Sequence, residues 1–310
     1  VIENAGSAAT TATLTRNTDT SYPLAVSLTS SDITAAKVPL SVTIPAGQAS
    51  VQFPIAAVDD AVLDVTQPVV ISASVADQLV LDAAFGAAGR VIETGVTIYA
   101  VGRDGMGRIV AAGSKGGEIW IARYLPSGIL DATFSDDGIF TGDLGTRGPI
   151  AYSIRFDSNG RIVVGGRADP AGYNYDFMVA RLWDDGTLDT TFGGGDGVAV
   201  NHFGGSGASQ WVDEIEVLAS GKILAAGTTS VSGSSYDFAL ARYTATGSLD
   251  TTFNSSGLAT AAVTTSYDQA QGLVVLSDGT AIVGGGANVG GGGYGRFAMA
   301  KFTTSGGLDA

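Results

Sequence analysis

Three stretches in the middle of the chain read Gly160-Arg161-Ile162-Val163, Val179-Ala180-Arg181-Leu182 and Leu188-Asp189-Thr190-Thr191-Phe192. Versions of them recur in the same order through residues 78–310. Within residues 78–310 the Leu-Asp pair occurs five times, and 49 to 61 residues separate its successive aspartates, Asp82, Asp131, Asp189, Asp250 and Asp309. Three markers in one fixed order indicate an internal repeat of about 60 residues, in which each unit stacks on its neighbours.

Each repeat contains four segments with the length and residue types of short β-strands: in the middle of the chain these are Gly197–Val200, Ile150–Phe156, Arg161–Gly165 and Phe177–Leu182. The stretch Asp157-Ser158-Asn159-Gly160 predicts a tight hairpin turn between two of them. Four antiparallel strands per repeat are typical of a propeller blade, and a β-solenoid is the alternative. Small residues such as Gly165-Gly166 fit strands that crowd near a central axis.

Residues 1–77 differ from the rest, because short runs of alternating apolar and polar residues replace the repeat. This spacing predicts a small antiparallel β-sandwich. We therefore expect an all-β protein, with an Ig-like sandwich over residues 1–77 and four-stranded propeller repeats over residues 78–310. The repeat units end near Asp131, Asp189, Asp250 and Asp309. A closed ring of four blades is crowded, and a larger propeller that these residues leave incomplete is the alternative.

Composition excludes several classes of protein. The chain has no cysteine and one histidine, His202, so thiol catalysis, disulfide scaffolds and multi-His metal sites are excluded. Its 16 basic and 30 acidic residues give a net charge of −14, which argues against a nucleic-acid partner. No apolar run is long enough for a transmembrane helix, so no membrane span is expected.

The sequence offers little for catalysis. His202 has no Gly-x-Ser-x-Gly partner, which argues against a serine hydrolase. Glu214 and Glu216 alternate along one strand and share a face, as a glycosidase pair could, but the solvent face of an edge strand is the simpler interpretation. We therefore predict that the protein is not an enzyme.

The repeated charged residues are expected to serve the repeat itself. Each Leu-Asp aspartate is predicted to cap the turn that it opens, although a ring of carboxylates that binds cations is the alternative. The matching basic series is predicted to bind carboxylates within or between blades, and it consists of Arg123, Arg181, Arg242 and Lys301.

Aromatic residues suggest a ligand surface. Tyr173, Tyr175 and Tyr236 lie in loops that precede equivalent strands, so they are expected on one face of the propeller, where they could bind a glycan. Packing within and between blades is the alternative use of the chain's aromatic residues, above all of its Trp residues.

The three markers resemble the delta-60 repeat, a propeller-like repeat of large secreted bacterial proteins. Residues 1–77 resemble, more loosely, the Calx-beta domain through Ile2-Glu3-Asn4-Ala5-Gly6, Ile44-Pro45-Ala46-Gly47 and the stretch from Val58 to Asp64. Together the two resemblances imply a piece of a long modular protein, secreted or at the bacterial cell surface. They imply no enzyme activity for the repeats.

The Calx-beta resemblance also implies a calcium site formed by Glu3, Asp59, Asp60 and Asp64. Calcium prefers such hard oxygen ligands. The pattern departs from the family at Gln67, where an acidic residue is expected, and the Gly-x-Asp-Tyr stretch is missing. Solvated turn aspartates are the alternative.

These observations predict a non-enzymatic structural or adhesive module of an exported bacterial protein, with a capacity to self-assemble. Its expected partners are other copies of itself, surface polymers or glycans. Two alternatives stay open, a lectin-like carbohydrate-binding propeller and, less favoured, a polysaccharide-active enzyme.

Overall fold

The computed structural model describes residues 9–17, 20, 23–58, 68–75, 82–170, 174–204, 209–232, 235–288 and 295–309. The chain divides into two compact units, Val1–Val80 and Leu81–Ala310. All regular structure in the described ranges is β-strand, in agreement with the predicted fold class. Over the same ranges, no helix has the length and apolarity needed to cross a membrane.

The N-terminal unit contains two three-stranded antiparallel sheets, in the orders β1-β5-β3 and β4-β2-β6. Their strands are β1 (Thr10–Thr15), β2 (Leu24–Ser30), β3 (Ala36–Lys37), β4 (Ser41–Ile44), β5 (Ser50–Ala57) and β6 (Ile71–Val75). Val26 and Leu28 of one sheet and Phe53 of the other belong to a single apolar core. The unit is therefore a β-sandwich, and the alternating side chains of β2 and β5 fill its interior.

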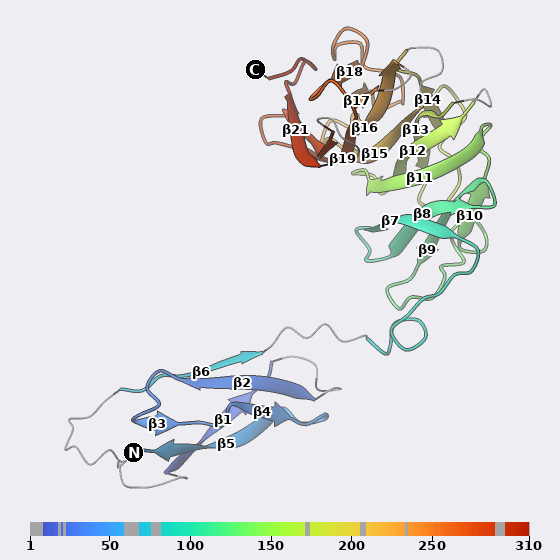
Figure 1. Ribbon diagram of the computed structural model, residues 1–310. Helices are drawn as coiled ribbons and strands as arrows, with labels where there is room; N and C mark the ends of the chain where they lie inside the picture. Colours follow the sequence, from blue (N-terminus) through green and yellow to red (C-terminus); the bar gives the residue numbers. More distant parts are fainter. Residues whose placement is uncertain are drawn as a thin grey trace. The chain divides into compact units, whose positions relative to one another are not determined.

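The C-terminal unit is a series of four antiparallel sheets that follow one another along the chain (Figure 1). We number them blades 1 to 4. Blades 1 and 2 consist of β7 (Thr97–Arg103), β8 (Ile109–Lys115), β9 (Glu118–Tyr124), β10 (Ile139–Gly142), β11 (Arg147–Phe156), β12 (Ile162–Asp169), β13 (Asp176–Leu182) and β14 (Val198–Asn201). Blades 3 and 4 consist of β15 (Gln210–Val217), β16 (Ile223–Ser232), β17 (Ser235–Tyr243), β18 (Leu258–Ala261), β19 (Asp268–Val275), β20 (Ala281–Ala287) and β21 (Arg296–Phe302).

Neighbouring strands of each blade are joined in chain order, which is the arrangement of a propeller blade. The short fourth strand comes after the Leu-Asp-x-x-Phe stretch and pairs back with the third strand, so that Ala180 lies opposite Val198. Each complete sheet thus extends past its Leu-Asp pair. Blade 4 has three strands in the described part of the chain.

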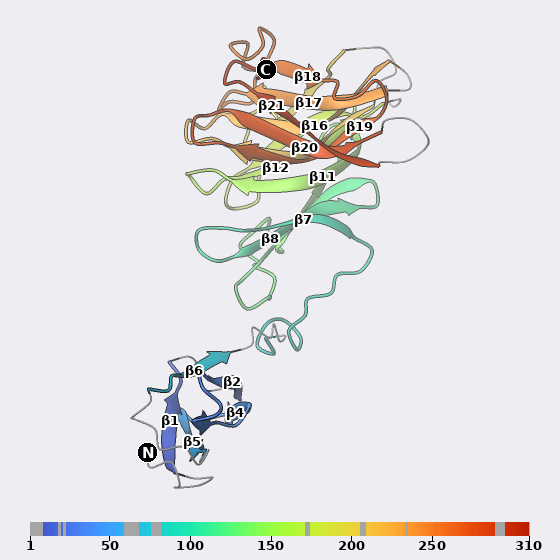
Figure 2. The same ribbon diagram turned by 60° about the vertical axis from the view of Figure 1, so that its left-hand side comes forward.

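Successive blades lie over one another, as both ribbon views show (Figures 1 and 2). Apolar side chains from facing sheets form one core per joint: Ile119 and Ile121 of blade 1 share a core with Ala151 and Ile154 of blade 2. Equivalent cores join blade 2 to blade 3 and blade 3 to blade 4. Burial between blades therefore provides the main apolar stabilisation of this unit.

A polar clamp also joins each blade to the next. In blade 2, the Arg181 Nε atom donates to Asp189 at 2.7 Å, and its Nη1 atom donates to the Ala245 carbonyl oxygen of blade 3 at 2.6 Å. Asp189 in turn accepts a hydrogen bond from the Thr191 N–H group at 3.0 Å. Arg123 and Arg242 make the same contacts in their own repeats. The prediction that the aspartates cap their turns is confirmed for Asp131, Asp189 and Asp250, and the prediction that the basic series links blades is confirmed for Arg123, Arg181 and Arg242.

The last residue of the Leu-Asp-x-x-Phe stretch completes the clamp. The ring of Phe134 lies under the Arg123 guanidinium, 4.9 Å from its centroid, and contacts Gly186 of the next repeat. A Cβ atom at Gly186 would approach this ring to 2.8 Å, and the residue has a φ of +87°. Only glycine fits this position without strain. The turn of one blade therefore needs glycine where the Phe of the preceding repeat packs against it.

Candidate functional site

A β-bulge recurs at one position of the first strand of every blade, which is an edge strand of its sheet. The pairing of β11 with β12 skips Tyr152, because Ala151 lies opposite Gly166 and Ser153 opposite Gly165. The equivalent skipped residues of the other blades are Tyr99, Asp213 and Gln271. A bulge redirects a side chain out of the regular alternation, and such bulges are frequent next to functional sites.

Glycine on the neighbouring strand makes room for each bulge. A Cβ atom on Gly166 would lie 1.8 Å from the Ile150 carbonyl oxygen, and one on Gly227 would lie 1.9 Å from the Trp211 carbonyl oxygen. Gly113 and Gly285 have the same close contact in blades 1 and 4. These glycines lie on the second strand of each blade, at the end of the segment predicted as Arg161–Gly165 in blade 2. The close approach of the neighbouring backbone explains why glycine occurs there.

Aromatic side chains from successive blades contact one another, and two of them, Tyr99 and Tyr152, are the residues at the bulges of blades 1 and 2. We call Tyr99, Tyr152, Tyr175, Trp211, Tyr236 and Tyr267 the aromatic band. Tyr99 and Tyr152 contact each other across blades 1 and 2, with ring centroids 4.9 Å apart. Across blades 3 and 4, Tyr236 contacts both Trp211 and Tyr267, at 5.6 and 4.4 Å. These partly exposed rings offer both apolar faces and hydroxyl groups to a ligand.

Polar contacts involving Tyr175 lie between the Tyr99–Tyr152 pair and the group of Trp211, Tyr236 and Tyr267. The Arg167 guanidinium lies 3.8 Å from the ring centroid of Tyr175 and 5.8 Å from that of Tyr152. Its Nε atom is buried and has no hydrogen-bond partner in the structure. The Gln210 N–H group, next to Trp211, donates to the Tyr175 carbonyl oxygen at 2.7 Å. A buried donor without a hydrogen-bond partner is unusual in a folded protein.

Two carboxyl groups close in sequence to residues of the aromatic band, those of Asp213 and Asp237, have raised pKa values. Burial raises the pKa of Asp213 to about 7, against weaker hydrogen bonds from the Trp211 indole and the Thr228 hydroxyl. Burial and the nearby Asp268 also raise the pKa of Asp237, which adjoins Tyr236. A carboxyl that keeps its proton near neutral pH can donate as well as accept a hydrogen bond. Perturbed carboxyls of this kind gather at functional sites more than elsewhere.

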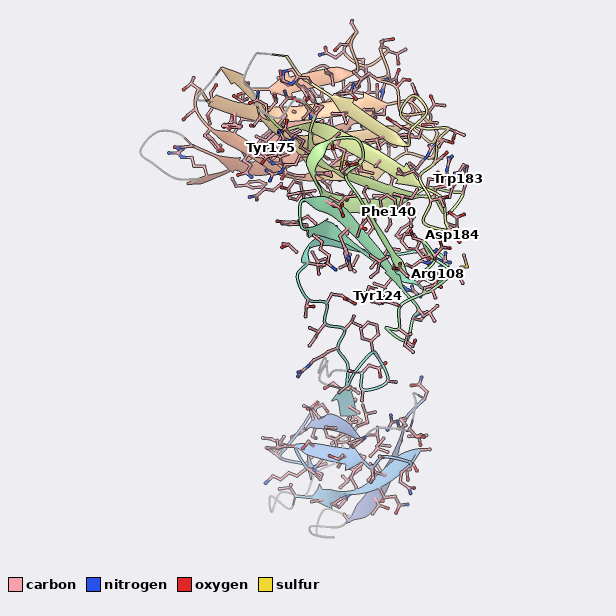
Figure 3. The ribbon with its side chains drawn as sticks, turned by 90° about the vertical axis from the view of Figure 1, so that its right-hand side faces the viewer. Arg108, Tyr124, Phe140, Tyr175, Trp183 and Asp184 are labelled. Carbon is pink, nitrogen blue, oxygen red and sulfur yellow. The ribbon has the colours of Figure 1, made fainter. Side chains whose placement is uncertain are left out.

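The clamp residues lie apart from Tyr175. Figure 3 places Tyr175 on one side of the propeller-like unit, and Arg108, Trp183 and Asp184 on the other. Arg108 binds Asp104 at 2.5 Å and also binds Asp184 of the next repeat. The carboxylates on this side are satisfied by arginines, threonines and backbone N–H groups, which favours the structural interpretation over a cation-binding ring. Among the described residues, no three acidic or histidine side chains form a group that could hold a metal.

Two of the predicted ligand residues lie in the aromatic band, and the others lie outside the described residues. Tyr175 and Tyr236 occupy equivalent positions in blades 2 and 3, and both belong to the aromatic band. Tyr173 lies outside the residues that the structure describes. The predicted calcium ligands Glu3, Asp59, Asp60 and Asp64 also lie outside them, so that site stays a prediction.

The acidic pair considered for catalysis is bound by an arginine. Arg155 of blade 2 contacts Glu214 at 3.0 Å and Glu216 at 3.2 Å, and the Ser153 hydroxyl donates to Glu214 at 2.5 Å. His202 approaches Asp176 at 2.6 Å through its Nδ1 atom. These contacts link blades 2 and 3 or fix a loop, and they favour a structural role for these residues.

Sequence reasoning missed most of the band. Tyr99, Tyr152, Arg167, Asp213 and Tyr267 were not singled out, and Trp211 was assigned first to packing. An alignment of the repeats on the glycine opposite each bulge would have brought Tyr99, Tyr152 and Asp213 into one column. That signal is weak, because the residue type changes from blade to blade.

Comparison with known families supports the architecture. A family model described as a domain of unknown function (DUF5122) beta-propeller matches residues 158–192 and 218–253. These two segments are equivalent parts of successive repeats, each ending on the Phe of a Leu-Asp-x-x-Phe stretch. No curated protein matches the chain. The match bears out a propeller-like repeat protein, whereas the delta-60 and Calx-beta resemblances stay predictions.

Proposed function

We propose that this propeller-like repeat protein is a non-enzymatic adhesive module of an exported bacterial protein, and that it binds neutral glycans through the aromatic band. The observation that carries the proposal is the series of contacts among six aromatic side chains from four blades, in which Arg167 packs on Tyr152 and Tyr175 and Trp211 donates a hydrogen bond to Asp213.

The chemistry of the band suits a sugar. A pyranose ring has an apolar face of C–H groups, which packs on a Tyr or Trp ring, and a rim of hydroxyl groups, which both donate and accept hydrogen bonds. The guanidinium of Arg167, a partly exposed residue, supplies donors, and protonated Asp213 supplies one donor and one acceptor. A net charge of −14 disfavours polyanions, so neutral polymers are the better partners.

Adhesion is favoured over catalysis by the state of the acidic residues. Glu214 and Glu216 both bind Arg155, so neither is poised as a free acid or nucleophile. The exported, bacterial setting follows from the two family resemblances given above. A polysaccharide-active enzyme would instead show turnover that Glu214→Gln or Glu216→Gln abolishes, whereas we expect no release of reducing ends by the unmodified protein.

Titration calorimetry with a panel of soluble neutral polysaccharides tests the proposal. Each aromatic contact contributes about 0.5–1.5 kcal/mol, so Tyr152→Ala and Tyr175→Ala should each weaken binding by up to about tenfold. Trp183→Ala is the matched control, because Trp183 is an exposed aromatic residue away from Tyr175. Absence of binding to every neutral glycan, or an equal loss in the Trp183 variant, would contradict the proposal.

A further inference from the structure

Two tyrosines from successive blades meet at the joint between blades 3 and 4. Tyr236 is the second residue of β17, and Tyr267 directly precedes β19. Their backbones form a parallel bridge, and their ring centroids lie 4.4 Å apart with the ring planes at 49°. Both the main chain and the side chain therefore hold one ring against the other across the joint.

The two hydroxyl groups are also in contact. Burial, the neighbouring phenol of Tyr267 and a hydrogen bond between the two side chains raise the pKa of Tyr236. A tyrosine side chain has one polar atom, its hydroxyl oxygen, so this hydrogen bond joins the two oxygen atoms. The Cε atoms, which are ortho to the hydroxyl group, lie between the ring centre and the oxygen. Because the ring centres and the oxygen atoms of the pair both lie close together, a Cε atom of one ring faces a Cε atom of the other.

This arrangement suits oxidative coupling of the two rings. A tyrosine that loses one electron and its hydroxyl proton becomes a phenoxyl radical, whose unpaired electron is shared between the oxygen and the ortho carbons. Two such radicals in contact form a Cε–Cε bond, and each ortho hydrogen then moves to the phenol oxygen of its own ring. In sum, two tyrosines are oxidised to one dityrosine while one hydrogen peroxide molecule is reduced to two water molecules. Coupling within a held pair is favoured over coupling between separate molecules, because the two rings are already in place.

We propose that Tyr236 and Tyr267 are a cross-linking site, at which a one-electron oxidant, a peroxidase with hydrogen peroxide, joins the pair as dityrosine. Both side chains are partly exposed, so an oxidant in solution has access to them. The new bond joins blade 3 to blade 4 within one molecule. This modification goes beyond the proposed glycan binding and does not rest on it.

The cross-link and the polar clamp hold opposite ends of one strand. Arg242, near the end of β17, donates to the Thr304 carbonyl oxygen of the blade 4 repeat at 2.6 Å, whereas Tyr236 lies at the beginning of β17. A covalent bond between the blades also restricts the unfolded chain, as a disulfide does. The cross-linked protein should therefore have a urea midpoint more than about 1 M above that of Tyr236→Phe protein treated in the same way.

The chain contains a second tyrosine pair that serves as a matched control. Tyr99 and Tyr152 contact each other across blades 1 and 2 with centroids 4.9 Å apart, but their ring planes are at 77°. In this edge-to-face arrangement the edge of one ring points at the face of the other. The ortho carbons therefore lack the edge-to-edge approach of Tyr236 and Tyr267, and we expect no coupling between Tyr99 and Tyr152.

Oxidation of the full chain by a haem peroxidase and limiting hydrogen peroxide tests the site. Dilute protein, and recovery of the monomer by size exclusion, remove the products of coupling between molecules. The monomer should lose two hydrogen atoms in its intact mass and gain dityrosine fluorescence. Trypsin cuts after Arg242, which lies between the two tyrosines, so mass spectrometry should find peptides 223–242 and 243–296 joined.

Conservative variants locate the bond. Tyr236→Phe and Tyr267→Phe keep both rings and remove one hydroxyl group, so each should abolish the joined peptides. Tyr99→Phe makes the same change in the control pair and should leave their yield unchanged. Absence of the joined peptides from the unmodified protein, under conditions that couple free tyrosine, overturns the proposal, and so does their survival in Tyr236→Phe or Tyr267→Phe.

Discussion

Replacing Arg181 by Met removes the centre of one clamp between blades and keeps much of the side-chain volume. Arg181 and Asp189 are both buried, and Arg181 also holds the Ala245 carbonyl oxygen of the next blade. Removal of one partner of a buried ion pair costs about 3–5 kcal/mol, because the other charge stays buried. Arg161 still binds Asp189 at 3.1 Å, so we expect a loss near the lower end, about 3 kcal/mol.

The chain contains its own matched control. Lys301 and Asp309 form the same pair in blade 4, but their side chains are 40% and 39% exposed. Exposed pairs contribute only about 0–1 kcal/mol, so Lys301→Met should change the free energy of unfolding little. In addition, Asp189→Asn in the Arg181→Met background removes the buried negative charge that has lost its Arg181 partner. It should recover part of the lost free energy of unfolding.

Urea unfolding followed by tryptophan fluorescence measures this difference. All three Trp residues lie in the C-terminal unit, so the signal reports on the blades alone. With a slope of about 2–3 kcal/mol/M, a loss of 3 kcal/mol lowers the unfolding midpoint by about 1–1.5 M. Equal shifts for Arg181→Met and Lys301→Met would refute the reasoning, because burial would then not determine the strength of the clamp.

Three further predictions concern the band and the core. Gly227→Ala should destabilise the protein by more than about 2 kcal/mol, since its Cβ atom would meet the Trp211 carbonyl oxygen, whereas Gly272→Ala, which has open space, should be neutral in the same urea assay. The folded state keeps a proton on Asp213 up to a pH of about 7, from an ordinary pKa of 3.8, so this group makes stability fall as pH rises through that window. Asp213→Asn should flatten the fall, by up to about 1.4 kcal/mol per pH unit, and an unchanged pH profile would contradict the raised pKa. Tyr243→Phe should raise the melting temperature or leave it unchanged, because the Tyr243 hydroxyl is buried without a hydrogen-bond partner, and a marked loss would indicate a water or partner there.

Local signals predicted the blades well. The turn Asp157-Ser158-Asn159-Gly160 joins β11 to β12 as expected, since the Gly160 N–H group donates to the Asp157 carbonyl oxygen and Gly160 has a positive φ. The Arg and Leu-Asp markers recur because every joint needs the same clamp. Because the same residues make the same contact in each repeat, the repeat can be recognised within this one sequence by comparing its units with one another.

The bulge position and the pairing of the fourth strand left weaker signals in the sequence. A bulge inserts one residue into the alternation of an inner strand, and Tyr152 is therefore out of phase with the pattern around it. The pairing of Val198–Asn201 with the preceding β13 is a long-range choice that local residues do not determine. Residues whose types differ between blades, such as Tyr99, Asp213 and Gln271, share a position only once the backbone is known.

The bulge separates two requirements that usually conflict in a binding site. Its shape is held by glycines such as Gly166 and Gly227 and by backbone contacts. Four blades already carry Tyr, Tyr, Asp and Gln at this position on one and the same backbone. Mutation there can change what the surface recognises while the backbone bulge is kept, so each duplicated repeat adds one position at which a new specificity can evolve.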